Sequence, residues 1–148
     1  MKKWFAILTV AALLFTAGCN FKVKKNTFSI ATENVKTVTL QKRCEDESGN
    51  TYYVEKTVDD KKEIKSICEK VRNTPLSRAD STVPQPINSV SYVIIIKSEI
   101  EQHFILNEEK AFFEQVAYEY ASEKTLDEYA SLYDSLNYAE VKAEPNLY

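Results

Sequence analysis

The chain has 148 residues, with 19 Lys or Arg against 22 Asp or Glu and a formal net charge of −3 at pH 7. This acidic balance argues against a nucleic-acid partner, which requires a basic surface. With two glycines in all, the chain cannot build a glycine-rich phosphate loop, and it carries no serine-hydrolase elbow, zinc-ligand spacing or dinucleotide fingerprint.

The first residues have the order of an export signal. Lys2 and Lys3 precede an apolar run over residues 4–17, which small residues and Cys19 follow. The run is shorter than the roughly 20 apolar residues of a membrane-spanning helix, and it suits the apolar segment of a secretory signal. We therefore predict a signal peptide over residues 1–18.

The segment Thr16-Ala17-Gly18-Cys19 resembles the lipobox that ends a bacterial lipoprotein signal peptide. The resemblance implies cleavage between Gly18 and Cys19 and a diacylglyceryl group on the Cys19 thiol. The alternative is an ordinary cleaved signal followed by an incidental cysteine, since Ala17 and Gly18 suit either peptidase. The lipoprotein interpretation places the protein on the outer face of the cytoplasmic membrane, or on the outer membrane if the cell is Gram-negative.

Cleavage would also change the charge. Loss of Lys2 and Lys3 lowers the formal charge from −3 to −5, so the remaining chain has no electrostatic attraction to anionic lipid. Two acyl chains anchor a protein stably, whereas one binds only marginally. We therefore expect the lipid to supply the membrane attachment, with no metal and no further cofactor.

The remaining chain divides into three parts. Residues 19–34 begin with the lipidated cysteine and continue as a polar, basic stretch without a period, which predicts a flexible tether. Residues 35–137 form a single domain, and residues 138–148 are a C-terminal tail. Alternating β-branched residues predict a strand pair over 35–44 and 51–58, joined by an acidic turn.

A helix and a loop follow this pair. Asp60, with Glu63 three positions later, predicts a capped helix that ends at Asn73. Residues 73–89 contain three prolines, and such a long loop is our candidate for a partner-binding segment.

The sequence of the second half of the domain predicts four strands and a helix. Strands are expected over 89–97, 100–106, 111–116 and 118–121. The first of these has apolar side chains on both of its faces, as a central strand has. Residues 112–122 could instead be helical, but their aromatic and β-branched side chains favour strands. A capping box at Thr125–Glu128 opens the last helix. The predicted fold class is α+β, a mainly antiparallel sheet in the order β-β-α-β-β-β-β-α with two helices on one face.

This pattern is similar to small lipoproteins of Firmicutes. The likeness covers residues 35–137, and its most specific part is Phe113-Glu114-Gln115, then Tyr118-Glu119 and a helix rich in Leu and Tyr. The families concerned have no assigned activity, so the resemblance implies no catalytic residue.

Few side chains suggest chemistry. Cys44 and Cys68 would face one core, where they form a disulfide or remain two buried thiols. His103, the single histidine, could pair with either thiol as a nucleophile and base, although nothing in the sequence brings them together. The acidic turn at residues 45–50 could hold calcium but lacks the EF-hand spacing. Tyrosines of the last helix could form a binding platform, although their spacing favours core packing.

The sequence therefore favours a non-enzymatic module that binds an extracytoplasmic protein or peptide through the 73–89 loop and exposed sheet edges. Immunity and exclusion lipoproteins are one type that fits. The alternative is a cell-wall polysaccharide binder or a wall-active enzyme. A deep pocket with His103 or converging carboxylates would favour that alternative, whereas a flat, apolar exposed surface would favour the interaction module.

Overall fold

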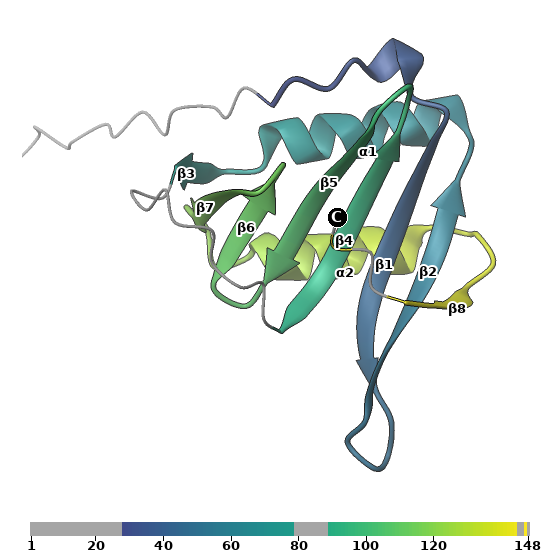
Figure 1. Ribbon diagram of the computed structural model, residues 1–148, viewed down its shortest axis with the longest axis vertical. Helices are drawn as coiled ribbons and strands as arrows, with labels where there is room; N and C mark the ends of the chain where they lie inside the picture. Colours follow the sequence, from purple (N-terminus) through teal and green to yellow (C-terminus); the bar gives the residue numbers. More distant parts are fainter. Residues whose placement is uncertain (1–27, 79–88, 145–146, 148) are drawn as a thin grey trace, which may run out of the picture.

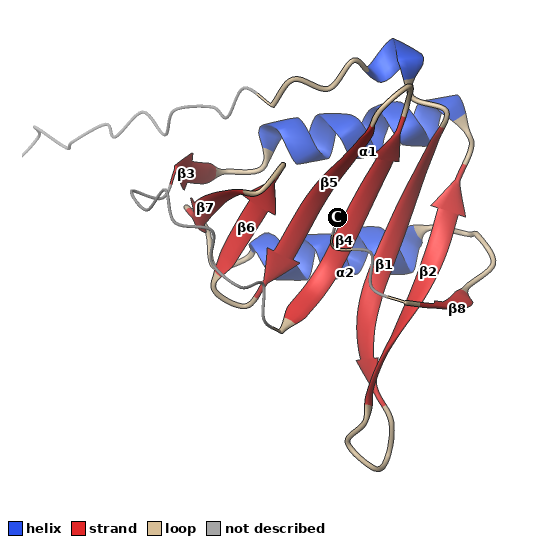
Figure 2. Ribbon diagram, in the orientation of Figure 1, coloured by secondary structure: helices blue, strands red, loops and turns tan. Residues whose placement is uncertain are grey.

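The computed structural model describes residues 28–78, 89–144 and 147, which form an antiparallel sheet with two helices on one face (Figures 1 and 2). This confirms the predicted α+β fold class. The elements are the 3-10 helix η2 (Thr32–Asn34), the strands β1 (Thr37–Glu45), β2 (Thr51–Val58), β3 (Leu76–Arg78), β4 (Val90–Lys97), β5 (Glu101–Asn107), β6 (Lys110–Phe113), β7 (Val116–Tyr120) and β8 (Val141–Ala143), and the helices α1 (Lys61–Asn73) and α2 (Thr125–Ser135). The described strands pair in the order β3-β7-β6-β5-β4-β1-β2-β8.

Strand β4 lies in the interior of the sheet, between β5 and β1. Ile94 and Ile96 belong to the apolar cluster that includes the helices, whereas Val93 and Ile95 belong to a second cluster without helical residues. Alternate residues of a strand point to opposite faces, so these two clusters lie on the two faces of the sheet. The predicted central strand, buried on both faces, is confirmed.

Helix α1 begins where its cap was predicted. The Asp60 carboxylate accepts the backbone N–H groups of Lys62 and Glu63, at 2.9 and 3.0 Å. These bonds satisfy two of the donors that every helix leaves open at its N-terminus. The apolar stripe of the helix packs on the sheet through its buried residues Ile64, Ile67, Cys68 and Val71.

The predicted capping box of α2 is wrong. The helix has Lys124 at its N-cap with no side-chain cap, and Thr125 is already helical. The Thr125 hydroxyl instead donates to the Ser122 carbonyl at 2.9 Å. Because the threonine sits one position too late, its oxygen cannot meet the N–H groups of the first turn.

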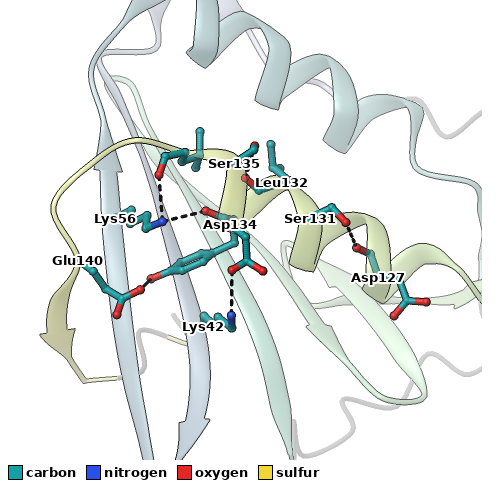
Figure 3. A network of polar contacts seen from close by, with 10 residues as sticks. Lys42, Lys56, Asp127, Ser131, Leu132, Asp134, Ser135 and Glu140 are labelled. Carbon is teal, nitrogen blue, oxygen red and sulfur yellow. Dashed lines mark hydrogen bonds and ion pairs between the residues drawn. The ribbon is translucent and has the colours of Figure 1, made fainter.

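The C-terminal end of α2 is held by a lysine from the sheet (Figure 3). Lys56 Nζ donates to the carbonyls of Tyr133 and Leu136, at 3.1 and 3.0 Å, and lies 4.7 Å from the centre of the Tyr133 ring. Lys42 Nζ pairs with Asp134 Oδ1 at 3.0 Å. Positive charge at this end complements the helix dipole, so two lysines of the β1–β2 hairpin dock α2 on the sheet.

The packed domain begins earlier than predicted, which corrects the tether proposed for residues 19–34. Phe28 and Ile30 are each only 7% exposed, and the Phe28 ring stacks on Phe113 with a centroid distance of 4.3 Å. Gln102 also donates to the Ser29 carbonyl at 3.1 Å. Two apolar residues in a polar stretch give no periodic signal, although both reach the core.

The C-terminal segment is also part of the fold, which corrects the tail proposed for residues 138–148. Strand β8 pairs with β2 over residues 53–55. The Tyr138 hydroxyl donates to Glu63 at the start of α1. A three-residue edge strand is too short to show alternation, so the sequence pattern did not reveal it.

The predicted 73–89 loop is divided. Leu76–Arg78 form β3 against β7, and the buried Thr74 hydroxyl lies 2.7 Å from the Tyr129 hydroxyl. Residues 79–88, the remainder of the candidate partner-binding loop, lie outside the described residues.

Replacement of Phe28 tests whether the N-terminal segment is part of the domain. Phe28→Ala is expected to lower the free energy of unfolding by about 3 kcal/mol, because it removes a buried ring from a packed aromatic cluster. Ser29→Ala, which removes only an exposed hydroxyl, is the control and should change stability by less than about 0.5 kcal/mol. Urea denaturation measures both. Equal free energies of unfolding for the two variants would instead support the original prediction that residues 19–34 are a flexible tether.

Candidate functional site

The structure separates the two cysteines that the sequence suggested as a pair. Both are free thiols, so the disulfide is not formed. Cys44 lies near the end of β1, opposite Tyr52, whereas Cys68 is fully buried in α1 beside Thr32 and Arg72. Burial raises the pKa of the Cys68 thiol, against the lowering effects of Arg72 and the Thr32 hydrogen bond. Neither thiol lines the cavity that contains His103. Gly18 and Cys19 lie outside the described residues.

In the acidic turn between β1 and β2, the Asp46 carboxylate makes its hydrogen bonds within the turn. Asp46 accepts the N–H groups of Ser48 and Asn50 and the side-chain amide of Asn50, at 2.8–3.0 Å. Hydrogen bonds from Asn50 lower the pKa of Asp46. Gly49 supplies the left-handed backbone with φ of 81°. No three His, Cys, Asp or Glu side chains of the described residues are grouped to hold a metal ion.

The tyrosines of α2 belong to the core. Tyr129 and Tyr133 are fully buried and pack in the cluster between the sheet and the helices. Their hydroxyls bond within the domain, to Thr74 and to Glu140. Of the two alternatives in the sequence, core packing is therefore the one observed.

His103 lies in a cavity on the face of the sheet opposite the helices. In β5 its side chain shares a face with Ile105, whereas Phe104 and Leu106 point toward the helices. The cavity has a volume of about 330 Å³ and is lined by Glu101, His103, Ile105, Phe112, Glu114 and Gln115. The buried Ile105 and Phe112 give it an apolar floor, and the other four residues supply polar groups.

The wall of this cavity includes an unusual turn. Glu114 and Gln115 connect β6 to β7 with φ of 48° and 67°. Two consecutive positive φ angles are typical of a type I′ hairpin, which normally selects Asn-Gly. The turn divides the single strand predicted over residues 111–116, and it carries none of the glycine that would have marked it.

The Glu114 carboxylate explains how the turn is held. Its Oε1 accepts the N–H of His103 at 2.8 Å, and the Glu114 N–H donates to the His103 carbonyl at 3.3 Å. The regular pairing of β5 with β6 ends at Phe104 and Phe113, so these two bonds extend it by one residue. The side chain thereby offsets part of the strain of the turn.

The imidazole ring is nearly enclosed. The His103 side chain is 11% exposed, and its Nε2 lies 3.1 Å from Glu101 Oε1 in an orientation that makes no hydrogen bond. Glu101 also pairs with Lys97 at 3.3 Å. The ring nitrogen is thus buried beside a carboxylate whose charge a neighbouring lysine partly balances.

A second cavity of similar size, about 340 Å³, lies between the end of β1 and α2. Cys44, Tyr92 and Asp127 are among its lining residues, and no histidine is. Three carboxylates, those of Glu45, Glu108 and Asp127, also line this second cavity. The His103 cavity is the stronger candidate because its wall combines a buried ring nitrogen with a strained turn. The sequence analysis singled out His103 but neither Glu101 nor Glu114 as site residues.

The comparisons add no relative. No family model matches the chain, and no curated protein or solved structure is similar enough to count as a match. Within the described residues, neither helix has the length and apolar character needed to cross a bilayer.

The thiols provide a test of the packing around α1. In a Cys19→Ser background without reductant, the intact mass should show no two-proton deficit. Iodoacetamide under native conditions should modify Cys44 and spare Cys68, because Cys68 is buried and its raised pKa disfavours the reactive thiolate. Denaturation should expose both thiols to the reagent. A two-proton deficit, or equal native labelling, would contradict this arrangement.

Proposed function

We propose that the protein is a lipid-anchored extracytoplasmic lipoprotein that acts as a non-enzymatic module for binding a protein or peptide. The segment from Lys2 to Cys19, with its resemblance to a lipoprotein signal, supports the anchor. The formal charge of −5 after cleavage supports the view that the lipid, rather than the protein surface, makes the membrane attachment. Immunity and exclusion lipoproteins are one type of module that fits.

A cavity that contains His103 and two carboxylates meets the condition under which we expected a wall-active protein or polysaccharide binder. The way its carboxylates are engaged is nevertheless the single observation that carries the binding role. Glu114 is bonded to the backbone of β5, and Glu101 is paired with Lys97. Among the described residues, no serine, threonine or cysteine lines this cavity as a nucleophile. Polar groups placed around an apolar floor suit recognition of a ligand better than bond cleavage.

The length of the tether limits where a partner can lie. Because Phe28 is already packed in the domain, at most the eight residues 20–27 separate the domain from the lipidated cysteine. A fully extended chain of this length reaches no more than about 30 Å. The tether therefore keeps the domain near the membrane surface, where we expect it to meet its partner.

A polysaccharide binder or wall-active enzyme is the second candidate. It is favoured by the same cavity, in which the buried His103 Nε2 lies near the carboxylate of Glu101. Release of reducing ends from purified cell wall by the wild-type protein, lost in His103→Gln, would replace the binding module by this alternative.

Metabolic labelling with radioactive palmitate tests the anchor. The wild-type protein should incorporate the label and remain with the membrane fraction, because two acyl chains hold it stably. Cys19→Ala should lose both properties. Cys44→Ala is the matched control, since it removes a cysteine outside the lipobox, and it should label like the wild type. Label retained on Cys19→Ala would reject the lipid anchor.

A further inference from the structure

We propose that the His103 cavity binds a basic side chain, arginine or lysine, of the partner. This inference rests on the proposed function and specifies the chemistry of its ligand. The site comprises the carboxylates of Glu101 and Glu114, the His103 ring and the apolar floor of Ile105 and Phe112.

The size of the cavity fits one side chain. Ligand-binding cavities typically measure about 300–1,000 Å³, and this one, at about 330 Å³, is at the lower limit. Ile105 and Phe112 can pack against the methylene groups of a long side chain, as apolar surfaces commonly do with the stems of lysine and arginine.

The carboxylates of the cavity favour a ligand that donates hydrogen bonds. Carboxylates are acceptors only, and each can accept several hydrogen bonds, whereas lysine and arginine carry donors only. Glu114 therefore keeps acceptor capacity while it binds the His103 N–H. In the part of the chain that the structure describes, no lysine or arginine lines the cavity.

Lys97, a described cation that pairs with a lining carboxylate, does not close the cavity. Lys97 pairs with Glu101 at 3.3 Å, and the two side chains are 49% and 37% exposed. Such solvent-exposed ion pairs contribute little and exchange easily. Glu99 adds a further negative charge in the turn between β4 and β5. The negative charges around the cavity outnumber the positive ones, as they do in the whole chain, and this favours a cationic ligand.

The strained turn supports a role for Glu114 in ligand binding. Residues with a side chain rarely adopt positive φ, and here two adjacent ones do. Strained backbone of this kind is concentrated at ligand-binding sites. In this turn the strain directs a carboxylate toward His103, at the wall of the cavity, where Asn-Gly would leave no charge.

The single histidine provides an unambiguous reporter. The Cε1–H signal of His103 in the protein after signal cleavage, held in detergent micelles, would be followed by NMR. The probes are N-acetyl-arginine amide and N-acetyl-lysine amide, with N-acetyl-norleucine amide as the uncharged control. Either basic probe should shift the signal saturably, and the norleucine probe should not. No shift with either basic probe, or an equal response to norleucine, would overturn the proposal.

Glu114→Gln tests the carboxylate itself. The amide oxygen can still accept the His103 N–H, so the turn is kept while the charge is lost. Affinity for the basic probe should fall about tenfold, as expected for loss of a charge-assisted hydrogen bond. Glu109→Gln, in the turn at the other end of β6, is the matched control and should bind like the wild type. Unchanged affinity in Glu114→Gln would reject the site, as would an equal loss in the control.

A second variant covers the case in which Glu114→Gln disturbs the turn and moves the His103 signal of the free protein. Glu101→Gln should then show the same loss of affinity, and its failure to do so would reject the site.

The two proposals also fail separately. Binding of the basic probe without palmitate labelling would reject only the anchor, whereas labelling without probe binding would reject only this inference.

Discussion

The double burial of β4 is the constraint on which the rest of the structure depends. Val93, Ile94, Ile95 and Ile96 are all buried, with alternate side chains on opposite faces of the sheet. Full burial of one such side chain stabilises a fold by roughly 1.5–3 kcal/mol. Both faces of the sheet must therefore be covered, although the two described helices cover only one.

The two ends of the domain contribute to this cover on opposite faces. Phe28 packs with Phe104 and Phe113 in the cluster that includes the helices. Near the other end, Leu147 packs against the second cluster, and Gln41 donates to the Glu144 carbonyl at 3.0 Å. The segments that were predicted as a tether and a tail are thus partly required by the sheet between them.

The same alternation places the candidate site. His103 shares a face with Ile105, so it lies at the border between the second apolar cluster and the turn that carries Glu99. At this border the His103 ring is nearly enclosed, although it lies outside the main apolar cluster between the sheet and the helices. Glu114 reaches it because β5 and β6 are adjacent and antiparallel, and the cavity is a consequence of that register.

Long periodic segments were predictable from the sequence, and short or aperiodic ones were not. The alternation of β1 and β2 and the apolar stripe of α1 each identified an element and its buried face, and the apolar run of β4 identified a strand buried on both faces. The turn at Glu114–Gln115 was missed because neither residue type marks a turn. β3 and β8 have three residues each, too few for a period. His103 could be singled out as the one histidine, but its partners Glu101 and Glu114 become neighbours only through strand register.

Native-state hydrogen exchange of the β4 amides tests the central claim most directly. If β4 is the doubly covered centre of the domain, the amides of Val93–Ile96 should exchange only through global unfolding, with the free energy measured by urea denaturation. The amides of the edge strand β8 should exchange through smaller openings. Exchange of the β4 amides at free energies well below the global value, similar to those of β8, would contradict the account.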